Sequence, residues 1–213
     1  MTDERLEIDH VVIGVIDLDL ATSRLRDEHG LLALPGGRHP AWGTANRIVA
    51  LGSTYLELVA VVEPEIAVRS AFGRWVSDMA AGRTGGGWAV RTHDMAATAE
   101  RLGLDVVAGS RVGSEGRELR WQLAGVPLDG GADPRLPFFI SWAEGTPLPG
   151  SANVRHPAGR MVLERLEVEC DPEALGAWLA GCVLPVAATS GLRGVTSVSC
   201  ASAQRVITLS LPW

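Results

Sequence analysis

Two polar residues interrupt apolar segments near the start of the chain, and both are of types that do acid–base or metal chemistry. His10 lies within the segment Glu7–Val15, and Glu57 lies within Thr54–Val62. A carboxylate on a buried strand face is costly unless a cation, a metal or a strong donor meets it. The pair could therefore be metal ligands, or a base with its orienting partner. We predict both as catalytic residues and as a tentative, incomplete metal site.

The alternation of side chains along a strand predicts what surrounds these two residues. It places His10 on one face with Ile8 and Val12, and Glu57 on one face with Val59. For His10 the alternative is a core histidine bonded to a backbone carbonyl. For Glu57 the alternative is a solvent-facing strand, which the apolar neighbours disfavour.

The segment Gly36–Asn46 collects further candidates for ligand binding in a short space. It contains His39, Trp42 and Asn46 among glycines that permit unusual backbone shapes. We predict these three as ligand-binding residues on a loop. The alternative is a surface turn with Trp42 as its apolar anchor.

Two more candidates lie later in the chain. Arg165 interrupts a strand whose other face is apolar, so it either lies in solvent or forms an arginine fork for a carboxylate or phosphate. Trp142 and Trp121 lie in strands, where they either wall a pocket or fill the core. We favour core filling for both tryptophans, and we include Arg165 and Trp142 among the candidate ligand-binding residues.

These residues must be positioned by elements that recur three times in the order strand, helix, strand, strand. We expect Asp17, Asp94 and Asp171 to begin the short helices. A longer helix is expected over residues 64–81, and a loop over Leu34–Thr44. The pattern predicts an α+β fold with a mostly antiparallel or mixed sheet and helices on the outer face. We divide the chain into a first module (1–63), a connecting helix with a second module (64–146), and a third, partial unit (147–213).

Composition excludes several classes of protein. The 213 residues are 46% hydrophobic and 21% charged, and no apolar segment approaches the roughly 20 residues of a spanning helix. The acidic segment 1–7 does not resemble a secretory signal. The three cysteines are an odd number without metal or disulfide spacing, so we expect free thiols in a reducing cytoplasm.

The basic residues narrow the function further. All 19 are arginine, which excludes chemistry that needs a lysine amine and suggests a GC-rich bacterial genome. The net charge of −6 without a basic stripe disfavours nucleic acid as a partner.

Several segments together resemble a known family. Leu6–Asp19 (LEIDHVVIGVIDLD), Gly36–Asn46 (GGRHPAWGTAN) and Thr54–Val61 (TYLELVAV) look like the opening module of a glyoxalase-like domain. Leu136–Trp142 and the following His156-Pro157 also resemble this branch of the vicinal oxygen chelate superfamily. The resemblance implies paired βαβββ modules forming a curved mixed sheet around a cleft, with a further short strand near residues 31–34.

The resemblance also implies roles for His10 and Glu57. In metal-dependent members a His on the first strand and a Glu on the last strand of a module help hold a divalent ion. The second module departs from this pattern, because Gly87 or Trp88 stands opposite His10, and residues 139–141 contain no carboxylate. His39 or His156 could supply a third ligand. We therefore expect a degenerate metal site and no resident metal, with a divalent ion as the alternative.

The leading hypothesis is a cytoplasmic glyoxalase-like protein that binds a small organic, anionic molecule in the cleft between its modules. The first alternative is a divalent-metal-dependent lyase, isomerase or dioxygenase. The second is a ligand-free scaffold or oligomerisation module, which predicts a filled cleft. We expect no nucleic-acid or membrane partner and leave a homodimer open.

Overall fold

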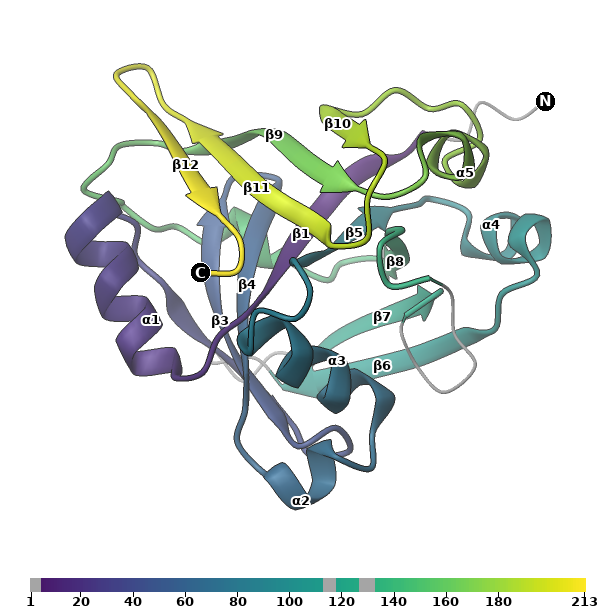
Figure 1. Cartoon of the computed structure of the whole chain (residues 1–213), viewed down its shortest axis with the longest axis horizontal. Coiled ribbons are helices and arrows are strands. Elements are labelled where there is room, and N and C mark those ends of the chain that lie inside the picture. The colour runs from purple at the N-terminus through teal and green to yellow at the C-terminus, as the bar shows by residue number, and fades with distance from the viewer. Residues whose placement is uncertain (1–4, 113–117, 127–132) are drawn as a thin grey trace.

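The computed structural model describes residues 5–112, 118–126 and 133–213 (Figure 1). In this part of the chain the fold is mixed α+β, as predicted, and its strands form two sheets. The strands of the larger sheet are β1 (Glu7–Gly14), β2 (Leu34–His39), β3 (Thr44–Leu51), β4 (Thr54–Val61), β5 (Gly87–Arg91), β6 (Val106–Val112), β7 (Glu118–Ala124) and β8 (Phe138–Trp142). Those of the smaller sheet are β9 (Val162–Glu169), β10 (Val186–Thr189), β11 (Gly194–Ala201) and β12 (Val206–Ser210).

The helices connect these strands. They are α1 (Leu18–Arg24) with its continuation η1 (Leu25–His29), α2 (Pro64–Ala67), α3 (Ala71–Ala80), α4 (Met95–Leu102), η2 (Pro149–Ser151) and α5 (Pro172–Trp178). Among the described residues, none of the helices combines the length and the apolarity that crossing a bilayer requires.

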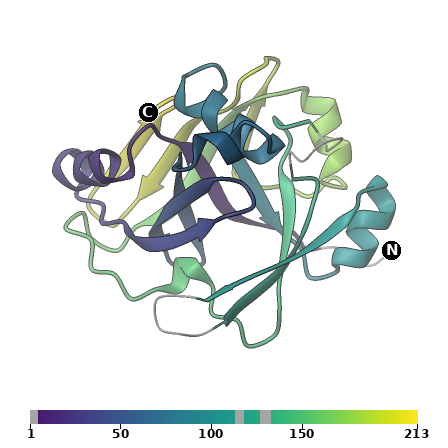
Figure 2. The ribbon, with the colours of Figure 1, turned by 90° about the horizontal axis from the view of Figure 1, so that it is seen from below.

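The larger sheet consists of two modules with the same βαβββ order. Its strand order is β2-β3-β4-β1-β5-β8-β7-β6, and the modules join where β1 pairs antiparallel with β5. Within each module the first strand pairs parallel with the last, β1 with β4 and β5 with β8. Figure 2 shows the two halves curving as opposite sides of one sheet. The predicted paired modules and curved mixed sheet are confirmed.

Local capping explains why the short helices begin where they do. The carboxylate of Asp17 accepts hydrogen bonds from the backbone of Asp19 and Leu20, and Asp94 accepts one from Ala97. Asp171 caps α5 in the same way. A side-chain acceptor at this position satisfies backbone N–H groups that have no partner within the helix. All three predicted helix starts are confirmed.

Two predicted boundaries are wrong. Residues 34–39, predicted as part of a loop, form the edge strand β2, whose register with β3 shifts between Pro35 and Arg38. Glycine and proline indicate loops locally, but a bulge lets them pair at a sheet edge. The short strand expected near residues 31–34 is this one. The predicted helix over 64–81 is broken at Ser70, which caps α3 by accepting from Gly73.

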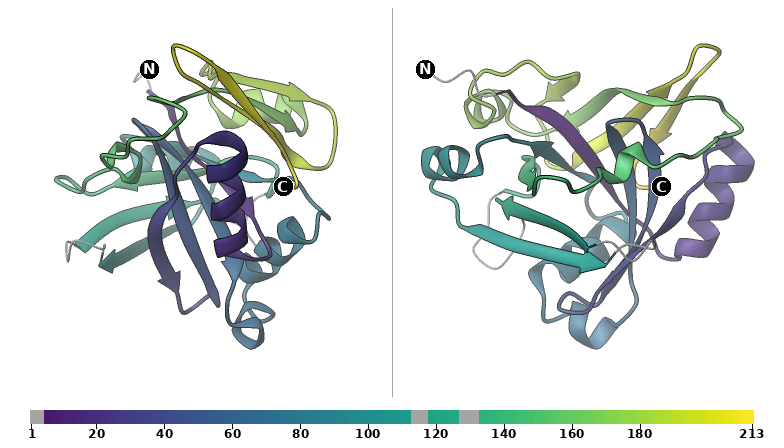
Figure 3. Two further views of the ribbon diagram at one scale, coloured as in Figure 1. Left: turned by 90° about the vertical axis from the view of Figure 1, so that its left-hand side faces the viewer. Right: turned by 180° about the vertical axis from the view of Figure 1, so that it is seen from behind.

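The smaller sheet covers the outer face of the larger one. Figures 1 and 3 show β9–β12 lying across β1 and β5, with α1 on one side and α4 on the other. One continuous core contains Trp88 and Phe139 from the larger sheet, Met95 from α4, and Leu166 and Val198 from the smaller sheet. The last two strands, β11 and β12, pair antiparallel with each other.

The inner face of the curved sheet has a separate core. Val12, Val59 and Ala89 pack there against Phe72 and Met79 of α3. In contrast to α1 and α4, α3 therefore lies against the inner face and closes part of the interior. The space left beside this core is the candidate site.

Candidate functional site

A cavity of about 70 Å³ lies on the inner face and is partly open to solvent. It is lined by His10, His39, Trp42, Asn46, Ile48, Tyr55, Glu57, Phe72, Arg111, Trp121, Leu123, Val126, Phe138, Ile140, Trp142 and Pro149. Apart from Arg165, every residue predicted for the site is in this set. Trp121, which we expected to fill the core, also lines the cavity, where its ring meets Trp142 edge-on at 5.7 Å.

Arg165 lies elsewhere. It is exposed on β9 of the smaller sheet, and Leu166 and Val168 on the other face of the strand are buried. This is the solvent-facing arrangement that the alternation of β9 allowed. The structure does not bring Arg165 to the residues of the cavity.

His10 is aimed into the cavity by an irregularity in β1. The register with β5 shifts between Ile8 and His10, so Ile8 packs in the outer core while Val12 packs in the inner one. The prediction that His10 shares a face with Ile8 is therefore wrong, because a bulge reverses the alternation. The imidazole is buried and stacks on Tyr55, with ring centroids 4.6 Å apart.

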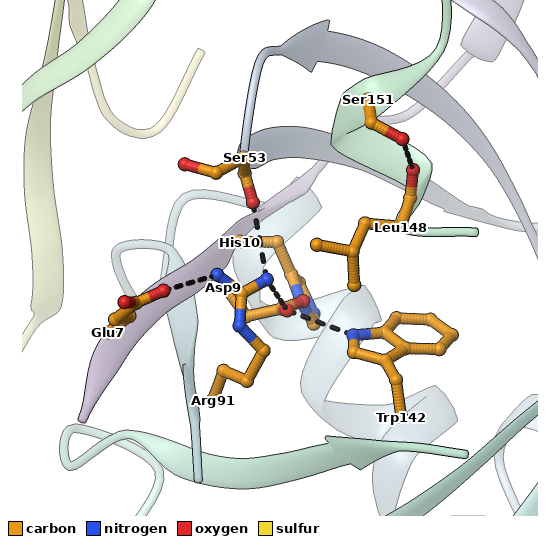
Figure 4. Close-up of polar contacts among 8 residues, drawn as sticks. All are labelled: Glu7, Asp9, His10, Ser53, Arg91, Trp142, Leu148 and Ser151. Atoms are coloured by element: carbon orange, nitrogen blue, oxygen red, sulfur yellow. Dashed lines mark hydrogen bonds and ion pairs between the residues drawn. The ribbon is translucent and has the colours of Figure 1, made fainter. Parts of the chain in front are cut away.

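Asp9 is the centre of a buried polar network beside His10 (Figure 4). Its Oδ1 lies 2.8 Å from His10 Nδ1, and its Oδ2 accepts hydrogen bonds from Trp142 Nε1 at 2.9 Å and Arg91 Nη1 at 3.2 Å. Arg91 also pairs with Glu7 at 2.6 Å. Since a carboxylate oxygen only accepts, His10 Nδ1 carries the proton. The other nitrogen, Nε2, is left for the cavity.

Glu57 lies beside His10 in the lining of the cavity. Its Oε2 lies 3.5 Å from His10 Nε2, and its Oε1 accepts a hydrogen bond from the Asn46 side-chain amide. Asn46 in turn accepts from the Gly37 backbone N–H. When neither His10 Nε2 nor Glu57 carries a proton there, two lone pairs face each other, so the pair favours a proton, a ligand donor or a cation between them.

The pKa values of His39 and Tyr55, which also line the cavity, are shifted in the direction of the neutral form. Burial lowers the pKa of His39, and the nearby Arg111 lowers it further against the opposing effect of Glu57. Burial raises the pKa of Tyr55 well above its usual value, and the carboxylates of Asp9 and Glu57 act in the same direction. The phenol of Tyr55 therefore stays protonated under ordinary conditions.

Our sequence reasoning missed Asp9, Arg91 and Arg111. Asp9 and Arg91 each interrupt an apolar strand, which is the signal that singled out His10, but neither was weighed. Arg111 carries no such signal, because it lies on an edge strand where an arginine is usually solvated. Its position in the cavity follows from the curvature of the sheet.

His156, considered as a third metal ligand, is a structural residue. Its Nδ1 accepts a hydrogen bond from the Leu32 backbone N–H at 2.9 Å, and its Nε2 lies 2.7 Å from the Ala50 carbonyl oxygen. Since both ring nitrogens are occupied by backbone groups, neither has a lone pair available for an ion.

The two paired modules, with His10 and Glu57 on one inner face, fall within the range of a known protein family. A family model described as "Glyoxalase-like domain" matches residues 8–183. This chain belongs to the glyoxalase-like domain family. The resemblance to a glyoxalase-like domain that the sequence indicated is therefore confirmed. No curated protein matches the chain.

One solved structure shares the fold of this glyoxalase-like domain at low sequence identity, and two others align over part of the chain. A hypothetical protein from Staphylococcus aureus aligns with a TM-score of 0.63 and 16% identity, over 97% of this chain and 86% of its own. The methylmalonyl-CoA epimerase from Mycobacterium tuberculosis aligns with a TM-score of 0.43 and 19% identity, over 64% of this chain and 86% of its own. A Streptomyces coelicolor methylmalonyl-CoA epimerase in complex with 2-nitronate-propionyl-CoA aligns with a TM-score of 0.45 and 22% identity, over 64% and 97%.

The donor set of this glyoxalase-like domain does not fit a divalent ion held by protein ligands alone. His10 Nε2 and Glu57 offer two donors, whereas the second module presents Ala89, Phe138 and Ile140 to the inner face. No group of three or more His, Cys, Asp or Glu side chains suited to a metal exists among the described residues. Protein zinc sites usually use three or four such ligands. The two converging side chains therefore provide fewer ligands than such a site requires.

The lowered pKa of His39 makes the free energy of unfolding depend on pH. Its pKa lies below the ordinary value of 6.5 in the folded state. As pH falls below about 6.5, the unfolded chain takes up a proton that the folded protein resists, so the free energy of unfolding decreases. We expect His39→Gln to have a smaller loss of stability between pH 7 and 5 than the natural protein, as measured by urea denaturation at each pH. Parallel pH profiles of the two proteins would contradict this.

Proposed function

We propose that this glyoxalase-like domain binds a small organic molecule in the cavity between its modules, with His10 and Glu57 holding the polar end of the ligand. The observation that carries the proposal is the convergence of these two groups, 3.5 Å apart, in a cavity with aromatic walls. Ligand sites typically combine an apolar lining with a few placed polar groups. A ligand-free scaffold predicts a filled cleft, and the cavity favours the binding function over that alternative.

The cavity also bounds the size of the ligand. The space of about 70 Å³ is roughly half of the engineered cavity of about 150 Å³ that binds benzene. It therefore encloses only a few heavy atoms, and any larger group must project through the open side.

A screen of small carbonyl compounds and organic acids by ligand-detected NMR tests the proposal. We expect binders whose affinity falls at least about tenfold in Glu57→Gln, since hydrogen bonds to charged groups contribute about 1.5–3 kcal/mol. Arg165→Gln is the control, because Arg165 is exposed on the smaller sheet. If the compounds bind Glu57→Gln and the natural protein with equal affinity, the site lies elsewhere.

Proton transfer is a second candidate function, favoured by the way Asp9 fixes the imidazole. With Nδ1 bonded to Asp9, His10 Nε2 and Glu57 can share one proton beside the ligand. A carboxylate at this place could take a proton from a carbon next to a carbonyl group, leaving an enolate, and return it afterwards. Exchange of that hydrogen for deuterium in D₂O, lost in Glu57→Gln but kept in Arg165→Gln, would support the transfer.

The metal-dependent alternative has its own test. Elemental analysis and titration with Zn²⁺ or Mn²⁺ would compare the natural protein with a His10→Ala, Glu57→Ala double variant. We expect less than stoichiometric metal in both, because the described residues bring together no group of three or more ligands suited to a metal. One bound ion per chain that disappears in the variant would favour a metalloenzyme.

We also propose a division of the chain after residues 63 and 146, a homodimer, and a cytoplasmic location. Limited proteolysis, light scattering after size-exclusion chromatography, and cell fractionation test them in turn.

A further inference from the structure

We infer that Arg111 binds the acid group of the ligand, and that the site therefore takes small monocarboxylates with an apolar body. This inference rests on the proposed function and names the class of ligand for the same cavity. Nothing in the family match or the structural likenesses assigns a role to Arg111.

Arg111 is a cation without a carboxylate partner among the described residues. It lies on β6 and lines the cavity, where its charge acts on both His39 and Tyr55. Two other arginines of the same sheet are paired: Arg91 with Glu7 and Asp9, and Arg120 with Glu118. Within the described ranges, the Arg111 guanidinium therefore has N–H donors that it can offer to a ligand in the aromatic cavity.

Arg111 is held where the two edges of the larger sheet meet. β2 and β6 are the outermost strands of that sheet, and curvature brings them together. A Cβ atom added at Gly37 on β2 would lie 3.0 Å from Arg111 Cδ and 3.3 Å from Nη1. Gly37 therefore leaves room for the arginine stem because it has no side chain.

The same glycine links Arg111 to the polar end of the cavity. The Gly37 backbone N–H donates to Asn46, and the Asn46 amide donates to Glu57. The position of the cation is thus coupled to that of the carboxylate through one short chain of contacts. Such support for a binding group reduces the ordering that a ligand must impose.

The charges of the cavity decide how an acid would lie in it. Glu57 repels an anion, so the ligand carboxylate goes to Arg111, whose planar guanidinium suits a bidentate pair. The opposite end of the ligand, which carries an uncharged polar group such as a hydroxyl, then faces His10 and Glu57, and the apolar body between the two ends contacts the tryptophan rings. A second negative charge on the ligand would fall near Glu57, which favours monocarboxylates over diacids.

Matched pairs of an acid and its primary amide test this inference on the full chain. We would measure dissociation constants for 3-hydroxypropanoate against 3-hydroxypropanamide, and for 3-hydroxybutanoate against 3-hydroxybutanamide, from the quenching of tryptophan fluorescence. We expect the natural protein to bind each acid about tenfold or more tightly than its amide, because the charge-assisted pair is lost in the amide. Arg111→Gln should lose this preference, and the control Arg165→Gln should keep it.

The outcomes separate the inference from the proposed function. Equal binding of acid and amide by the natural protein, with both weakened in Glu57→Gln, would overturn the inference and leave the proposed function standing. An acid preference that survives in Arg111→Gln would also overturn it. If no acid or amide binds the folded natural protein, both fail. Arg111→Lys keeps the positive charge but loses the planar guanidinium, so we expect an intermediate preference for the acid over the amide. This variant replaces Arg111→Gln if Arg111→Gln does not fold.

Discussion

Replacing Asp9 with alanine is expected to lower the free energy of unfolding by about 3–5 kcal/mol, the usual cost of removing one partner of a buried ion pair. The Asp9 side chain is 1% exposed and that of Arg91 is 9% exposed, so water cannot take the place of the carboxylate. The variant also leaves His10 Nδ1 and Trp142 Nε1 without their acceptor. Urea denaturation at pH 7 measures the change.

Glu7→Gln is the matched control for this prediction. Glu7 pairs with the same arginine at 2.6 Å, but its side chain is 39% exposed, so solvent screens the pair. We expect a loss of no more than about 1 kcal/mol. A loss in Asp9→Ala as small as that in Glu7→Gln would show that the buried network contributes little to stability.

Trp88→Ala is expected to destabilise the protein by about 3–5 kcal/mol, as is typical for truncating a fully buried aromatic residue. Trp88 lies on β5, is 1% exposed and packs in the core between the two sheets. Its removal leaves a cavity where the smaller sheet rests on the larger one. The midpoint of urea denaturation measures the loss.

Trp88→Phe provides the comparison at the same position. The indole Nε1 has no hydrogen-bond partner within the described part of the chain, and an unsatisfied buried donor costs about 1–3 kcal/mol. Phenylalanine removes this donor and keeps most of the ring, so we expect a net change below about 1.5 kcal/mol. Equal destabilisation by both substitutions would mean that the core cannot accommodate either change in shape.

Local chemistry explains which parts of the fold were predictable. The helices that begin at Asp17 and Asp94 depend on a side chain bonding its own neighbours, so a few residues suffice to locate them. β2 depends on pairing with β3, which its glycines and proline do not indicate. Its assignment as a loop failed because pairing with the following strand outweighs the preference of these residues for turns.

The candidate site divides in the same way. His10 and Glu57 stood out because each is polar within an apolar strand, and alternation places such residues on a defined face. Ile8 was misplaced because one bulge reverses that alternation. Polarity and alternation along a strand contain no information on distances between modules. The hydrogen bonds of Asp9 with Arg91 and Trp142 could therefore not be predicted from the sequence.

The sequence by itself indicated the glyoxalase-like family and its paired modules through its resemblance to that family, and local polarity singled out His10 and Glu57. Only the tertiary structure decided that Arg111 rather than Arg165 lies at the cavity. Both are arginines on strands with polar neighbours, and their sequence environments do not distinguish them. The curvature of the larger sheet brings β6 against β2, while β9 turns its arginine to solvent because its apolar face covers the outer core. Contacts between elements far apart in the chain set that difference.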